Sequence, residues 1–180
     1  IDAVVAAGFA LGICEPQSSG IGGGGFMVIR FAKTGETKFI DFREIAPKNA
    51  TPDMWKEDKD GNVIGNEKVV GGKSIGVPGE VKGMLYALEK YGTMSREKVM
   101  QPAIDLAENG YKVSAVLNRD MKNSFERIEQ YPETAEIYLD GGLPFEVGSI
   151  LKNPDLANTL RKIMKNGEKA FYEGEIAEAI

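Results

Sequence analysis

The chain has 180 residues, a formal net charge of −5, one cysteine and no histidine. This length fits one domain with a sizeable core, so we expect residues 1–180 to form a single domain. The acidic balance, without a long basic run, argues against nucleic acid or an anionic membrane as a partner. Without histidine, the chain cannot contain a Ser-His-Asp or Cys-His nucleophile system or a histidine metal site. We expect no metal and no cofactor.

The first element expected is an apolar helix over residues 3–14, ended by Glu15-Pro16. It is too short to span a bilayer and lacks the basic start of a signal peptide, so we expect a core helix and no membrane span. Cys14 cannot form an internal disulfide, and its place at the helix end favours a buried, inert thiol over a reactive one. The face expected to pack carries Val4, Ala7, Leu11 and Cys14.

A glycine run followed by two strands is the centre of the pattern. Residues 22–25 are four consecutive glycines, and their missing Cβ atoms let the backbone pass close to other backbone or to a ligand. The nearly continuous apolar run over 26–31 predicts a strand buried on both faces. Residues 33–36 predict a hairpin turn. A second strand is expected over 37–42, and it ends among charged residues.

The glycine run also satisfies G-x-G-x-x-G at Gly20, Gly22 and Gly25, with Asp41 at a suitable distance for a ribose-binding acid. A dinucleotide site needs a strand before the glycines and a helix after them. Here the expected helix comes first and the strand follows. No Gly-Lys-Ser/Thr completes a phosphate loop either, so we reject nucleotide binding.

Beyond the hairpin the sequence predicts mostly helices. Pro102 should kink or break one of them. The expected elements are a short helix at 51–55, an exposed turn or loop at 56–66, a glycine-broken strand at 69–77, helices at 78–91, 95–109, 114–130 and 153–166, a short helix or extended piece at 132–139, and the start of a helix at 175–180.

The loop at 56–66 contains a spacing of acidic residues that suggests calcium, with Asp58, Asp60 and Asn62 in alternate positions. A calcium-binding EF-hand loop requires glycine at its sixth position and glutamate at its twelfth. Counted from Asp58, these positions hold Val63 and Val69. We therefore favour a solvated hairpin.

Five motifs span nearly the whole chain: residues 16–26 (PQSSGIGGGGF), 41–47 (DFREIAP), 76–81 (GVPGEV), 102–110 (PAIDLAENG) and 170–174 (AFYEG). Together they resemble the start of the large subunit of gamma-glutamyltranspeptidases. The resemblance implies an α+β fold: a helix-rich fragment, with a few core strands, of the αββα sandwich of N-terminal-nucleophile hydrolases. It also implies that the chain is a truncated N-terminal portion of the large subunit. Related cephalosporin acylases share the same general pattern.

The family's reaction, as the resemblance implies, transfers a gamma-glutamyl group from glutathione-like donors to water or an amino acid. The family's nucleophile is a threonine that becomes the N-terminus of a small subunit when the precursor cleaves itself, and its α-amino group acts as base. Nothing here matches that threonine, so we expect no catalytic residue in this chain and no activity of the fragment alone. The expected partner is the small subunit from the same precursor. The resemblance favours an extracytoplasmic location.

One binding residue of the family maps onto this chain. Arg43 matches the arginine that grips the α-carboxylate of the donor, and Asp41 and Glu44 would orient it. A guanidinium suits this role because its planar fork binds a carboxylate bidentately and keeps its charge when partly buried. The alternative is that Arg43 forms a structural salt bridge with Asp41 or Glu44.

Three functions remain open at this point. The first is gamma-glutamyl transfer or hydrolysis by an N-terminal-nucleophile enzyme, of which this chain is a fragment. The second is a related amidase that acts on glutaryl side chains or on poly-gamma-glutamate. The third is a non-catalytic domain that keeps the fold for binding or assembly.

Overall fold

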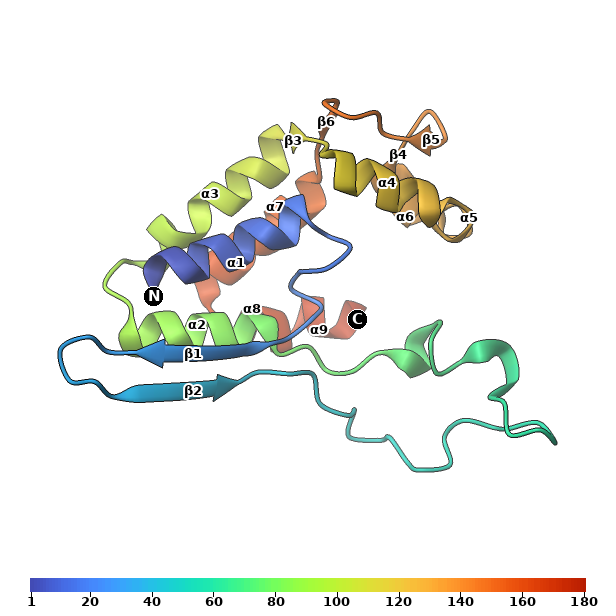
Figure 1. Ribbon diagram of the computed structural model, residues 1–180, viewed down its shortest axis with the longest axis horizontal. Helices are drawn as coiled ribbons and strands as arrows, with labels where there is room; N and C mark the ends of the chain where they lie inside the picture. Colours follow the sequence, from blue (N-terminus) through green and yellow to red (C-terminus); the bar gives the residue numbers. More distant parts are fainter.

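The structure is a computed structural model that describes residues 1–180. Its principal helices lie on one side of an antiparallel hairpin formed by β1 (Phe26–Arg30) and β2 (Thr37–Asp41) (Figure 1). The helices are α1 (Asp2–Cys14), α2 (Glu80–Tyr91), α3 (Arg96–Asn109), α4 (Ala115–Asn123), α5 (Phe125–Ile128), α6 (Pro132–Tyr138), α7 (Pro154–Asn166), α8 (Lys169–Tyr172) and α9 (Glu175–Ala179).

The remaining regular elements are short, and the sequence did not predict them. Strand β3 (Tyr111–Lys112) pairs with β6 (Ile150–Leu151), and β4 (Leu139–Asp140) pairs with β5 (Leu143–Pro144). Two single 3-10 turns, η1 (Ile64–Asn66) and η2 (Gly72–Ser74), lie in the long connection between β2 and α2.

The core forms where α3 packs against both α1 and α7. The buried face of α1 differs from the expected one, since Val4 and Leu11 are about half exposed. The helix is apolar on every side, so its sequence contains no periodic signal that could select a face. The side chains of α1 that are buried are Val5, Phe9 and Ile13.

The β-hairpin places one face against the helices. Met27 and Ile29 are buried there, whereas Phe26 and Val28 are 60% and 69% exposed. The expectation of a strand buried on both faces is therefore wrong for this chain, because helices cover only one side of the hairpin. The predicted turn at 33–36 is confirmed, and Gly35 adopts φ +72° within it.

The connection between β2 and α2 contains less regular structure than expected. Residues 51–55 form a turn instead of a helix, with the Met54 amide donating to the Thr51 carbonyl. The strand expected at 69–77 is reduced to one bridge between Val77 and Ile45. Glycines 71, 72 and 76 interrupt the run, which prevents a continuous ladder.

Two helices differ from the expected boundaries. Helix α3 continues through Pro102 without a break, since its buried side, including Met100 and Ile104, packs against α1 and α7. The helix expected at 114–130 is divided at Ser124, where ψ is 9°. The start of this helix follows the prediction, because the Ser114 hydroxyl accepts a hydrogen bond from the Leu117 amide at 3.0 Å.

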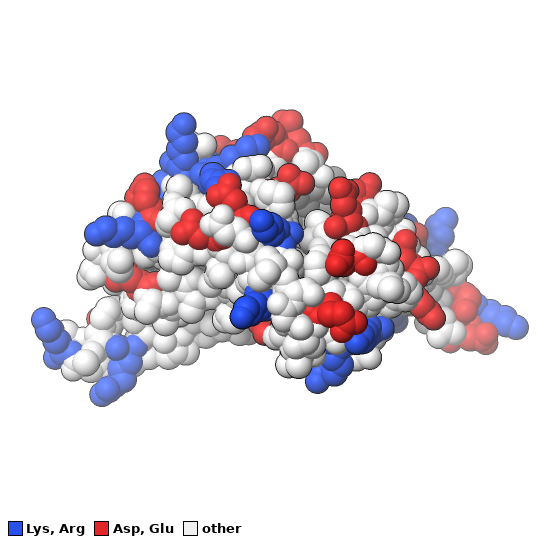
Figure 2. Space-filling view, turned by 90° about the horizontal axis from the view of Figure 1, so that it is seen from above, with Lys and Arg blue, Asp and Glu red and all other residues white.

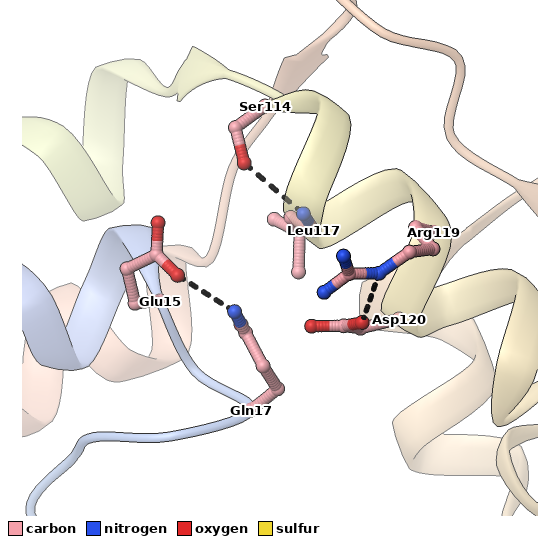
Figure 3. A network of polar contacts seen from close by, with 6 residues as sticks. All are labelled: Glu15, Gln17, Ser114, Leu117, Arg119 and Asp120. Atoms are coloured by element: carbon pink, nitrogen blue, oxygen red, sulfur yellow. Dashed lines mark hydrogen bonds and ion pairs between the residues drawn. The ribbon is translucent and has the colours of Figure 1, made fainter.

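The loop that leaves α1 lies beside α4 (Figure 3). The side-chain amide of Gln17 donates a hydrogen bond to the Glu15 carboxylate at 2.7 Å. On the surface of α4, the Arg119 guanidinium pairs with the Asp120 carboxylate at 3.0 Å. Cys14 is half-buried, and burial, followed by the charge of Glu15, raises the pKa of its thiol. This favours the inert thiol, in agreement with the expectation.

Charges of both signs are intermingled on the face shown in Figure 2, where lysine and arginine side chains do not gather into one area. None of the helices combines the length and apolar character needed to cross a membrane.

We predict that Asp2 stabilises the fold through its charge. Its carboxylate accepts hydrogen bonds from the Thr93 hydroxyl, the Met94 amide and the Thr93 amide, which hold the pKa of Asp2 below its ordinary 3.8. A carboxylate whose pKa is lower in the folded state than in the unfolded state stabilises the fold at pH values above the unfolded-state pKa. This stabilisation is lost as the pH falls through the folded-state pKa. Asp2→Asn should therefore lower the urea midpoint at neutral pH, and the difference should shrink between about pH 5 and pH 3.

The matched control for this prediction is Asp53→Asn, which changes an exposed acid that accepts no hydrogen bond. A midpoint difference for Asp2→Asn that stays constant over that pH range would show that the charge of Asp2 contributes nothing.

Candidate functional site

Arg43 lies two residues after the end of β2, at the end of the hairpin that adjoins the glycine run. Its backbone amide donates to the Asp41 carboxylate at 3.0 Å. Its guanidinium pairs with the Glu44 carboxylate at 3.2 Å. The predicted cluster therefore exists, but its two acids act on different parts of Arg43: Asp41 fixes the backbone, and Glu44 contacts the side chain.

The ion pair with Glu44 does not confine the arginine. The side chain of Arg43 is 55% exposed and that of Glu44 is 27% exposed. Exposed pairs of this kind are typically worth about 0–1 kcal/mol. The structural salt bridge foreseen as the alternative is thus present, but it involves one acid and leaves the guanidinium accessible.

An aromatic side chain lies beneath the guanidinium. The Cζ atom of Arg43 is 6.0 Å from the centre of the Phe26 ring, at the limit of a cation–π contact. Phe26 in turn stacks on Phe39 with ring centres 5.8 Å apart. Both rings belong to the exposed face of the hairpin, so Arg43 and this apolar face lie on the same side of the fold.

Two open cavities meet at Arg43. One, of about 500 Å³, is bordered by the loop after α1, the glycine run, Glu44 and Glu80. The other, of about 820 Å³, lies between β2, α2 and α8. The guanidinium is therefore reachable by a small polar molecule.

Glu80 is a buried acid that sequence reasoning did not single out. It is 7% exposed at the start of α2 and belongs to the same polar cavity as Glu44. Burial, followed by the charge of Glu44, raises the pKa of Glu80. In sequence it looks like an ordinary acid in the first turn of a helix, so no local signal distinguishes it.

No group of three or more histidine, cysteine, aspartate or glutamate side chains could hold a metal ion. The loop at 56–66 forms the solvated hairpin favoured by the sequence. Glu57 and Val63 form an antiparallel β-bridge, and the Asp58 carboxylate accepts hydrogen bonds from the backbone amides of Asp60 and Asn62. These bonds engage Asp58 with the backbone of its own turn.

A sequence model described as gamma-glutamyltranspeptidase matches residues 1–180. The chain is 41% identical to a glutathione hydrolase proenzyme of Bacillus subtilis over its full length, which is 30% of that relative. The gamma-glutamyltranspeptidase of Helicobacter pylori superposes on 99% of this chain with a TM-score of 0.92 and 43% identity, over 51% of its own chain. A cephalosporin acylase of Bacillus halodurans superposes on 98% of this chain with a TM-score of 0.85 and 25% identity, over 33% of its own chain.

These matches confirm the expected fold, a helix-rich α+β portion of the N-terminal-nucleophile hydrolase sandwich. The chain spans about 30% of the length of the glutathione hydrolase that it matches. The order of helix, glycine run, hairpin and Arg43 agrees with the motifs that suggested the relationship. The chain belongs to the gamma-glutamyltranspeptidase family.

Proposed function

We propose that the protein containing this chain transfers or hydrolyses the gamma-glutamyl group of glutathione-like amides, with water or an amino acid as acceptor. Residues 1–180 would be the N-terminal portion of its large subunit. The nucleophile would be the N-terminal threonine of a small subunit released from the same precursor. The family match supports this proposal. Such a threonine uses its own amine as base.

The observation that carries the proposal is that the Arg43 guanidinium is accessible and paired with a single acid. A guanidinium has five N–H donors in a planar fork, and Glu44 is the one acid paired with it. The remaining donors can bind a second carboxylate bidentately. We assign this role to the α-carboxylate of the gamma-glutamyl donor, with Asp41 and Glu44 orienting the arginine.

The exposed apolar face of the β1–β2 hairpin supports the proposal that further polypeptide packs against residues 1–180. Phe26, Val28 and Phe39 are each at least 60% exposed and lie near one another on β1 and β2. Contiguous apolar surface of this kind marks an interaction site in soluble proteins. The remainder of the large subunit or the small subunit would cover it.

The likeness to the cephalosporin acylase supports a second candidate, an amidase for glutaryl side chains. Poly-gamma-glutamate is a further substrate of the same class. A glutaryl group also ends in a carboxylate, so Arg43 would serve both substrates. The α-amino group distinguishes the two substrates, because a gamma-glutamyl group carries it and a glutaryl group does not. A purely binding protein would hydrolyse neither.

We predict that Arg43→Ala raises KM for gamma-glutamyl p-nitroanilide about 30-fold, because a charge-assisted contact is worth about 2 kcal/mol. Little change is expected in kcat if the contact is equally strong in the ground and transition states. The measurement is release of p-nitroaniline by the full-length, self-cleaved protein. Gamma-aminobutyryl p-nitroanilide lacks the carboxylate and should be insensitive to Arg43→Ala, whereas glutaryl p-nitroanilide should respond to it.

Arg30→Ala is the control for this prediction, because Arg30 is an exposed arginine on β1 without an ion pair. Equal KM values for Arg43→Ala and the unchanged protein would remove the proposed role. A preference for glutaryl over gamma-glutamyl substrate would favour the acylase candidate.

We also predict that a polypeptide of residues 1–180 alone releases no p-nitroaniline above the buffer rate, because its sequence contains no match to the nucleophile. The full-length precursor should become active as it cleaves, and N-terminal sequencing of the smaller product should give threonine. Hydrolysis by residues 1–180 alone would contradict the assignment of the nucleophile.

A further inference from the structure

The backbone that leads into Arg43 passes between two glycines from distant parts of the sequence. A Cβ atom at Gly24 would lie 2.3 Å from the Phe42 carbonyl oxygen and 3.0 Å from the Arg43 Cα. A Cβ atom at Gly79 would lie 1.9 Å from the same oxygen and 2.7 Å from the Phe42 carbonyl carbon. Real Cβ atoms do not approach other atoms so closely, so both positions require glycine. We call this arrangement the glycine slot.

Hydrogen bonds hold the two walls of the glycine slot together. The Gly79 and Glu80 amides both donate to the Gly23 carbonyl at 2.9 Å. This joins the start of α2 to the glycine run. Gly25 and Phe42 exchange backbone hydrogen bonds at 3.2 and 2.9 Å, which extends the hairpin to the entrance of the slot.

A tyrosine from α8 holds the wall that contains Gly79. The Tyr172 hydroxyl donates to the Pro78 carbonyl at 2.8 Å and accepts from the Lys82 amide at 3.3 Å. These two groups lie on either side of Gly79 and Glu80 in the sequence. Tyr172 belongs to the AFYEG motif, to which the proposed function gives no role.

We infer that Gly79 and the Tyr172 hydroxyl are positioning residues for Arg43: the hydroxyl fixes the start of α2, and Gly79 there confines the Phe42 carbonyl. This inference rests on the proposed function, because it assigns these residues to the binding of the same carboxylate. A displacement near Phe42 is enlarged at the end of the long arginine side chain. Binding groups misplaced by about 1 Å lose much of their effect.

The first test replaces Tyr172 with phenylalanine, which removes one oxygen atom and keeps the ring. Loss of a neutral hydrogen bond of about 1 kcal/mol corresponds to about a 5-fold rise in KM for gamma-glutamyl p-nitroanilide. KM for the gamma-aminobutyryl compound and kcat for both compounds should stay within about 2-fold. Tyr131→Phe is the control, because Tyr131 is an exposed tyrosine before α6, lies outside both cavities and forms no side-chain hydrogen bond with the protein.

The second test replaces Gly79 with alanine, and its control is Gly72→Ala, since a Cβ at Gly72 meets nothing within 4 Å and Gly72 lies in η2, outside both cavities. We expect Gly79→Ala to raise KM for the gamma-glutamyl compound about 10-fold, with no effect from Gly72→Ala. If Gly79 acts through Arg43, the double variant with Arg43→Ala should have the KM of Arg43→Ala alone. Thermal unfolding of each purified variant identifies any that fail to fold. If Gly79→Ala does not fold, the KM of Tyr172→Phe is the test of the inference.

The outcomes separate this inference from the proposed function. If the full-length protein releases no p-nitroaniline, the proposed function fails; if it does but Arg43→Ala leaves KM unchanged, the proposed role of Arg43 fails. The inference fails in both cases. If Arg43→Ala raises KM but Tyr172→Phe does not, the proposed function stands and the inference is overturned. The inference is also overturned if Gly79→Ala adds its full effect to that of Arg43→Ala, or if KM rises equally for the compound without a carboxylate.

Discussion

The structure depends on a close contact between backbone segments at the Phe42 carbonyl. Gly24 approaches it from the glycine run and Gly79 from the start of α2. No side chain, even a methyl group, fits at either position. This contact joins the hairpin, the loop after α1 and the start of α2 in one place, and Arg43 is the next residue along the chain. Within the glycine run, close packing therefore requires Gly24, whereas a Cβ at Gly22 would meet nothing within 4 Å. None of residues 22–25 adopts positive φ.

This packing has a direct consequence for binding. Asp41 and the glycine slot fix the backbone of Arg43, whereas its guanidinium is held by one exposed ion pair and by contact with Phe26. A fixed backbone with an accessible guanidinium suits the capture of an anionic group, because the backbone is already ordered and the arginine side chain is the part left to order when the ligand binds. Glu44 and the buried Glu80 are the acidic residues that border the polar cavity, and Arg43 is the basic residue that borders it.

Local patterns predicted the elements that local chemistry determines. Ser95, Ser114 and Asn153 cap helices as expected, because each side chain accepts a bond from an amide three residues onward. The errors arose where tertiary contacts decide. A continuous apolar run cannot reveal that only one face of β1 is covered, and packing overrides Pro102. The motif singled out Arg43. The contacts of Gly79 with Phe42 and of Tyr172 with Pro78 and Lys82 join segments distant in sequence, for which no spacing rule exists.

The central claim is that Arg43 binds a carboxylate. The most direct test is a crystal structure of the full-length, self-cleaved protein with glutamate bound. We expect the Arg43 guanidinium to donate two hydrogen bonds of about 2.7–2.9 Å to the α-carboxylate of glutamate, while Asp41 still accepts from the Arg43 amide. A structure in which glutamate binds elsewhere, with Arg43 enclosed between Glu44 and another acid of the protein, would contradict it.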